Sequence, residues 1–256
     1  MKKIAFSLFA VLTMALVSFT AEAQYVRGDV DQDGTVTVGD VASLIDYLLN
    51  GTWNDDPVTP PEEHEWVDLG LPSGTLWATC NIGANAPEEY GDYFAWGETK
   101  PKSFYSFSTY KWSSGNYNTL TKYCNNSEYG EVDGKTKLEL EDDAAYVNWG
   151  PSWRIPTTNQ LAELCTNCTH ADTTMNNVKG VLVTGPNGNT MFMPLAGCRE
   201  DSLLHGDNLM GYYWSDELIS TTSYAAFYFN LSSWRYWFGY RRANGFTVRA
   251  VYMPQD

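Results

Sequence analysis

Three aspartates at alternate positions near the start of the chain have the spacing of calcium ligands. Asp29, Asp31 and Asp33 are followed by Gly34 and, at the twelfth position counted from Asp29, by Asp40. A hard divalent cation is bound by several oxygen atoms, and glycine lets one short loop turn sharply enough to supply them. The alternative is an acidic surface turn. We therefore predict a Ca²⁺ site with the ligands Asp29, Asp31, Asp33, Thr35, Thr37 and Asp40.

A short helix is expected directly after this loop. Val41, Leu44, Ile45 and Leu48 form an apolar stripe at helical spacing, and Asn50-Gly51 ends it. Loop and helix together resemble one repeat of a type I dockerin, a family that binds Ca²⁺ and docks on cohesin modules. A dockerin has two such repeats, whereas this sequence contains one. The resemblance implies Ca²⁺ as the cofactor and leaves docking on a cohesin-like partner open.

A second group of residues suited to binding lies near the end of the chain. Between Trp234 and Arg242, three arginines are interspersed with aromatic residues. Aromatic faces stack on sugar rings or anchor protein partners, and a guanidinium adds planar hydrogen bonding. The alternative is that Trp234 and Trp237 complete the hydrophobic core. We predict a ligand-binding surface formed by Trp234, Arg235, Tyr236, Trp237, Tyr240, Arg241 and Arg242.

The cysteines do not favour redox or zinc chemistry. Cys165 and Cys168 have the Cys-x-x-Cys spacing, but they fall at the C-terminal end of an expected helix, where the helix dipole does not lower a thiol pKa. Zinc would need further ligands, and there is no second Cys-x-x-Cys. We expect these thiols to pack beneath the helix end. The remaining cysteines are Cys80, Cys124 and Cys198, and the odd total leaves the disulfide pairing open.

No set of residues in the sequence predicts a catalytic centre. Glu139, Glu141, Asp142 and Asp143 are too close in sequence to face one another across a cleft, as the acids of a glycosidase do, and we interpret them as a solvated acidic loop. His64 lies in a linker and is expected to be too exposed to act as a base. The sequence also lacks a Gly-x-Ser-x-Gly elbow and a phosphate loop. These features favour a non-catalytic protein.

Composition restricts the partners and the compartment. A formal net charge of -15 argues against nucleic acid and anionic membrane surfaces, because both require a basic patch. Residues 1–23 combine Lys2-Lys3, an apolar run and the small-residue site Ala21-Glu22-Ala23, which is typical of a cleaved signal peptide. No other stretch is apolar enough to cross a bilayer. We therefore expect a secreted protein without a membrane span after cleavage.

The rest of the chain is expected to form one β-rich domain. Residues 24–51 hold the dockerin-like repeat, 52–64 a linker rich in proline and acid, and 65–256 the domain. Ten tryptophans and seventeen tyrosines favour strands and leave aromatic surfaces to spare. Strands are predicted at 65–69 and 75–82, and a hairpin at 178–183 and 190–195. Further alternation predicts one face formed by Ala225, Phe227, Phe229 and Leu231, and another by Phe246, Val248 and Ala250.

Two helices and a long loop region complete the expected elements. Residues 142–149 are predicted as a short helix, and Thr157 or Thr158 is expected to cap an amphipathic helix that contains Leu161 and Leu164. The polar and aromatic residues 104–129 show no clear period and are expected to form long loops.

Five motifs in this domain resemble the FISUMP-type major paralogous domain, which occurs on secreted and surface proteins of gut-type bacteria. They lie at 66–78, 90–98, 153–157, 211–215 and 245–249. The resemblance implies an α+β, C-type lectin-like fold with mixed antiparallel sheets, two helices and long loops on one face, and it brings no catalytic residues. We expect a secreted or cell-surface bacterial protein for adhesion to a glycan or protein ligand. The alternative is an accessory or catalytic component of a polysaccharide-degrading, cellulosome-like assembly.

Overall fold

The computed structural model describes residues 64–219, 221–232 and 235–253 of the 256-residue chain. The chain divides into two compact units, Met1–Pro60 and Pro61–Asp256, and all described residues belong to the second. The predicted signal peptide, the Ca²⁺ loop with its helix, and the linker as far as residue 63 lie outside the described residues.

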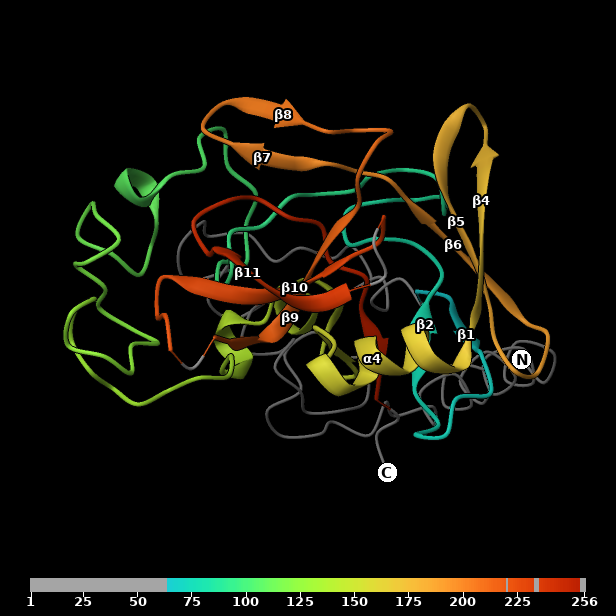
Figure 1. The fold of residues 1–256 in the computed structure, drawn as a ribbon, viewed down its shortest axis with the longest axis horizontal. Helices are drawn as coiled ribbons and strands as arrows, with labels where there is room; N and C mark the ends of the chain where they lie inside the picture. The colour runs from blue at the N-terminus through green and yellow to red at the C-terminus, as the bar shows by residue number, and fades with distance from the viewer. Residues whose placement is uncertain (1–63, 220, 233–234, 254–256) are drawn as a thin grey trace, which may run out of the picture. The chain divides into compact units, whose positions relative to one another are not determined.

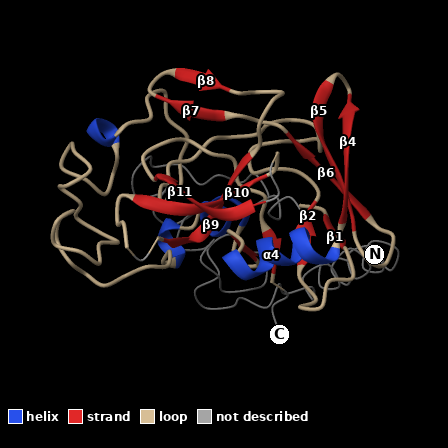
Figure 2. Ribbon diagram, viewed as in Figure 1, coloured by secondary structure: helices blue, strands red, loops and turns tan. Residues whose placement is uncertain are grey.

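The second unit is built mainly of antiparallel strands with few helices (Figures 1 and 2), which confirms the α+β class in general terms. One sheet has four strands in the order β1-β2-β12-β3. Val251 in β12 is paired with Trp77 on one side and with Arg154 on the other. The end of the domain is therefore held between two early strands. The bounds are β1 Trp66–Asp68, β2 Leu76–Ala78, β3 Trp153–Arg154 and β12 Val251–Tyr252.

Three further sheets contain the remaining strands. The orders are β4-β5-β6, β11-β10-β9 and β7-β8. The predicted hairpin is confirmed by β5 and β6, whereas β4 was not expected, because its sequence THADTTM is almost entirely polar and it pairs with β5 alone. The bounds are β4 Thr169–Met175, β5 Val178–Thr184, β6 Thr190–Pro194, β7 Cys198–Glu200, β8 Leu203–His205, β9 Tyr212–Leu218, β10 Ala225–Asn230 and β11 Arg235–Arg241.

The two predicted helices are present and are capped by side chains. In α3 (Ala144–Trp149) the carboxylate of Asp143 accepts hydrogen bonds from the first backbone N–H groups. In α4 (Thr158–Asn167) the capping residue is Thr157, which forms a reciprocal pair of hydrogen bonds with Gln160. The predicted loop region contains one short 3₁₀ turn at Phe107–Thr109.

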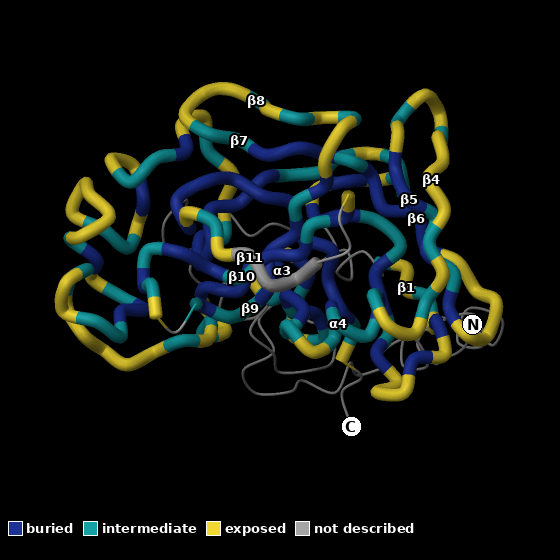
Figure 3. The backbone as a smooth tube through the Cα atoms, viewed as in Figure 1, coloured by how far each residue is buried: buried dark blue, intermediate teal, exposed yellow. Residues whose placement is uncertain are grey.

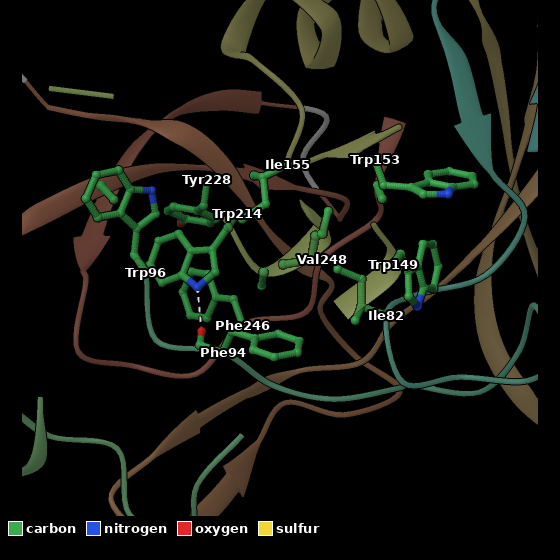
Figure 4. Packing of buried hydrophobic residues seen from close by; sticks show 14 of the residues in the cluster. Ile82, Phe94, Trp96, Trp149, Trp153, Ile155, Trp214, Tyr228, Phe246 and Val248 are labelled. Carbon is green, nitrogen blue, oxygen red and sulfur yellow. Dashed lines mark hydrogen bonds between the residues drawn. The ribbon is translucent and has the colours of Figure 1, made fainter. Parts of the chain in front are cut away.

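Hydrogen bonds from buried tryptophan side chains join residues 94–96 to strand β9 (Figure 4). Trp214 Nε1 donates to the carbonyl of Phe94 at 2.7 Å, and Trp96 Nε1 donates to the carbonyl of Ser215 at 2.8 Å. Phe246 stacks on Trp214 with a centroid distance of 4.1 Å. These residues belong to the motifs at 90–98, 211–215 and 245–249, so the motifs form the interior of the domain.

Burial does not alternate between the two faces in the last part of the chain. Ala225, Phe229 and Leu231 are buried, but Phe227 is half-buried and Tyr228 on the opposite face is buried as well. Residues on both faces of β10, the central strand of its sheet, are therefore buried, and Figure 3 colours the chain by this burial. The predicted second face is buried together with the residues between its members: Phe246, Thr247, Val248, Arg249 and Ala250.

Candidate functional site

The predicted ligand-binding segment coincides with β11 and the turn after it. Trp234 lies outside the described residues, as do the side chains of Arg235, Tyr236 and Trp237. The described members of the prediction are Tyr240, which is half-buried, Arg241, which is exposed, and Arg242, which is buried. The site can therefore be built from the end of this strand.

Arg242 does not contribute to an exposed surface. Its guanidinium is fully buried and donates to the backbone carbonyls of Tyr123 and Lys122, each at 2.6 Å. It also lies 5.2 Å from the ring centroid of Tyr110. Burial lowers the pKa of this guanidinium. Arg242 therefore ties the long loop region to the core, and its prediction as a ligand contact is not supported.

A hollow of about 560 Å³ opens beside Tyr240 and Arg241. Its walls come from β7, the turn between β9 and β10, and the paired ends of β10 and β11. A side chain at Gly239 would meet Ile219, so a larger residue at this position would require the Ile219 side chain to move. We call this site the arginine–tyrosine hollow. Its lining residues are Glu200, Ile219, Thr222, Tyr224, Ala225, Gly239, Tyr240 and Arg241.

The charged groups of the arginine–tyrosine hollow are one acid and one base. Arg241 Nη1 lies 3.7 Å from Glu200 Oε1, and the two side chains are 64% and 41% exposed. Burial raises the pKa of the Tyr240 hydroxyl, and the charge of Glu200 adds to this effect. Tyr240 is therefore neutral at physiological pH. The lining as a whole has no net charge.

Aromatic rings continue from the hollow across the neighbouring loops. The ring of Tyr224 lies edge to face with Tyr117 at 5.6 Å and with Tyr129 at 5.3 Å. Tyr117 in turn contacts Phe107 at 6.5 Å, and it remains 48% exposed. In Figure 1 the loops that carry Phe107, Tyr117 and Tyr129, drawn in green, lie beside the ends of β10 and β11. We call Phe107, Tyr117, Tyr224 and Tyr129 the aromatic run.

A second hollow, of about 630 Å³, contains a thiol that is poorly suited to catalysis. Cys80 donates to the carbonyl of Ala84 at 3.3 Å, and burial raises its pKa. The charged residues lining this hollow include Glu65 and Asp92. His64 also lines it and stacks on Trp149 at 3.8 Å, so the expectation of a freely exposed linker histidine was wrong.

The Cys165–Cys168 pair lies where the sequence predicted it, at the C-terminal end of α4. Both side chains are half-buried against the core, and all five cysteines are free thiols. Burial raises the pKa of Cys165 to about 11 and also raises that of Cys168. Neither thiol is activated as a nucleophile.

The acidic cluster is an ion-pair network rather than a solvated loop. Asp142 and Asp143 are buried, which corrects the prediction for these two residues. Lys122 Nζ lies 2.6 Å from Asp142 Oδ2 and 2.5 Å from Glu139 Oε2. Among the described residues, the oxygens of Glu139, Glu141 and Asp142 form the one group close enough to hold a metal ion. The ammonium group of Lys122 contacts all three of these carboxylates and would compete with a metal ion for them.

No protein-family model, curated protein or solved structure matches the chain. Within the described part, no helix is long and apolar enough to span a membrane. Of the residues that line the arginine–tyrosine hollow, the sequence predicted Tyr240 and Arg241. It missed Glu200 and Tyr224, because they come from other strands and turns, and nothing in their local sequence indicates that they meet.

Proposed function

We propose that this chain is a secreted or cell-surface bacterial protein that binds a glycan or a protein without catalysis. The observation that carries the proposal is the arginine–tyrosine hollow, where Tyr224, Tyr240, Arg241 and Glu200 meet around about 560 Å³. This volume is within the range of small-ligand sites, and the combination of ring faces with a few polar groups is typical of them.

The chemistry of the described residues favours binding over catalysis. The thiols of Cys80, Cys165, Cys168 and Cys198 all have raised pKa values, with burial as the first cause. The carboxylates of the hollow amount to Glu200 alone, and its neighbour is the cation Arg241. A glycosidase requires two acids across the scissile bond. The hollow therefore lacks the pair of acids that hydrolysis of a glycan would use.

We further propose that the domain is FISUMP-type with a C-type lectin-like fold. Its antiparallel sheets, its long loops and the helices α3 and α4 support this. For residues 24–51 we propose a dockerin-like attachment module that binds Ca²⁺ through its aspartates, supported by the oxygen-rich donor set of the sequence. Whether a cohesin-like protein docks there remains a separate hypothesis.

A glycan array with the full chain tests the proposed function. Arg241→Ala is expected to weaken binding about tenfold, because a guanidinium that is desolvated on binding contributes strongly to affinity. Arg154→Ala is the matched control, since Arg154 lies on β3 and does not line the hollow.

Two results would contradict the proposed function. One is an equal loss of binding in the two variants, which would place the ligand elsewhere. The other is the appearance of shortened glycans after incubation, which would favour the polysaccharide-degrading alternative.

A further inference from the structure

The charges of the arginine–tyrosine hollow select for a ligand without net charge. Glu200 and Arg241 are its charged lining residues and neutralise each other. An anionic ligand would have to compete with Glu200 for the guanidinium, and it would approach a chain of net charge -15. A cationic ligand would have to compete with Arg241 for the carboxylate of Glu200. A neutral ligand can contact both groups and leave the ion pair in place.

The polar atoms of the hollow select for a ligand rich in hydroxyl groups. Its lining residues include Glu200, whose carboxylate accepts hydrogen bonds, Arg241, whose guanidinium donates them, and Thr222, whose hydroxyl can do both. A purely apolar ligand would displace water from these polar groups without replacing its hydrogen bonds, which is costly. A sugar hydroxyl both donates and accepts, so neighbouring hydroxyls on one ring can satisfy the acid and the base together.

The aromatic run extends the site beyond one sugar unit. Tyr224 lines the hollow and also contacts Tyr117, whose ring is 48% exposed outside it. Sugar rings present C–H groups to aromatic faces, and a platform next to the hollow can receive the next unit. Tyr117 packs on Phe107 and Tyr224, so its ring is held in place before a ligand binds.

We propose that the ligand of the arginine–tyrosine hollow is a neutral oligosaccharide of two or more units, with one unit in the hollow and the next against Tyr117. This rests on the proposed function and names its ligand class. Affinity is expected to rise with the length of the oligosaccharide and to be insensitive to salt, because no net charge is neutralised on binding.

Calorimetric titration of the full chain tests the ligand class. The probes are neutral β-glucan, xylan and mannan oligosaccharides of increasing length, together with oligogalacturonates as anionic counterparts, each at low and high salt. The expected result is binding of a neutral series that strengthens with length. Arg241→Ala should weaken every member of that series.

Tyr117→Ala tests the second subsite. It should remove most of the gain from the longer oligosaccharides, about tenfold for the longest, and leave the shortest unchanged. Trp66→Ala is the matched control, because Trp66 is also 48% exposed and lies on β1. Circular dichroism of both variants checks that the fold is retained, as the exposure of these side chains leads us to expect.

The outcomes separate the inference from the function on which it rests. Salt-sensitive binding of oligogalacturonates that is lost in Arg241→Ala would overturn the neutral ligand and keep the hollow as the binding site. Equal effects of Tyr117→Ala on short and long oligosaccharides would overturn the second subsite. A failure of every neutral probe to bind would overturn the inference. Glycan binding that is unchanged in Arg241→Ala would overturn both the inference and the proposed binding site.

Discussion

Single aromatic residues act as hydrogen-bond donors throughout the interior. Tyr93, Tyr105 and Tyr110 are buried, and their hydroxyls donate to the backbone carbonyls of Ala196, Tyr93 and Trp96 at 2.5 to 2.6 Å. Each bond joins one loop to another, which satisfies carbonyl groups that have no strand partner. The high aromatic content is therefore used largely inside the domain. The number of aromatic residues in the sequence therefore does not tell which of them are buried and which form an exposed binding surface.

Asp216 carries the clearest prediction at this scale. Its Oδ1 is buried and makes no hydrogen bond to any described residue, and burial raises its pKa to about 7, with the charge of Glu217 adding to the effect. The folded chain therefore holds a proton that the unfolded chain releases near pH 4. Because the native state binds more protons between about pH 4 and 7, this group makes stability fall as pH rises through that window.

Asp216→Asn should remove that dependence. We expect a free energy of unfolding about 1–2 kcal/mol higher at pH 8, after allowance for partial solvent screening, and little change below about pH 4. Urea denaturation at several pH values measures it. Asp172→Asn on the exposed edge strand β4 is the control. A stability difference that does not vary with pH would contradict the assigned protonation.

At the scale of elements, local signals were predictable and long-range pairings were not. The cap at Thr157 and the β5–β6 hairpin are determined by residues close in sequence and were predicted, whereas the cap at Asp143 was not, because this residue was interpreted as part of a solvated acidic loop. By contrast, β7 and β8 are three residues each and carry too few positions for an alternation to be recognised. The same limit applies to the candidate site. Arg241 was recognisable from the residues around it in the sequence. Glu200 lies on β7, and its contact with Arg241 can be seen only in the folded structure.

Asp143 connects two of these elements and predicts a large effect. Its buried carboxylate accepts from Ala145 N and Tyr146 N at the start of α3 and from Ile155 N after β3. Asp143→Ala should lower the free energy of unfolding by about 1–3 kcal/mol, because it removes a helix cap and leaves buried N–H groups unpaired. Chemical denaturation measures this. Asp172→Ala should cost far less, and an equal cost in both variants would contradict the role of Asp143.

At the scale of the whole molecule, the chain contains the described domain and, before it in the sequence, a proposed attachment module. The acidic balance of the chain, at -15, suits a protein that attracts cations and avoids nucleic acid. The sequence predicted the general class of the domain, whereas ligand binding by residues 234–242 stays a prediction. It could not predict which aromatic residues stay exposed, because burial depends on packing between segments far apart in sequence.

Calcium binding by the full chain is the prediction that belongs to the module. Titration should show uptake of Ca²⁺ that a chelator reverses, and Asp31→Ala should weaken it about tenfold or abolish it, since it removes one oxygen ligand. Asp172→Ala is again the control, because it makes the same change of charge outside the predicted loop. Uptake that is unchanged in Asp31→Ala would place the ion elsewhere. No uptake at millimolar Ca²⁺ would contradict the proposed Ca²⁺-binding module.

We propose that the arginine–tyrosine hollow binds a ligand without catalysis. Hydrogen exchange of the full chain, with and without the neutral oligosaccharide that binds in the calorimetric titration, is the measurement that decides this. We expect slower amide exchange confined to residues 199–201, 221–225 and 239–241 and to the loop that carries Tyr117, together with recovery of the oligosaccharide at its original length. Protection centred on the Cys80 hollow instead, or recovery of shortened oligosaccharides, would contradict it.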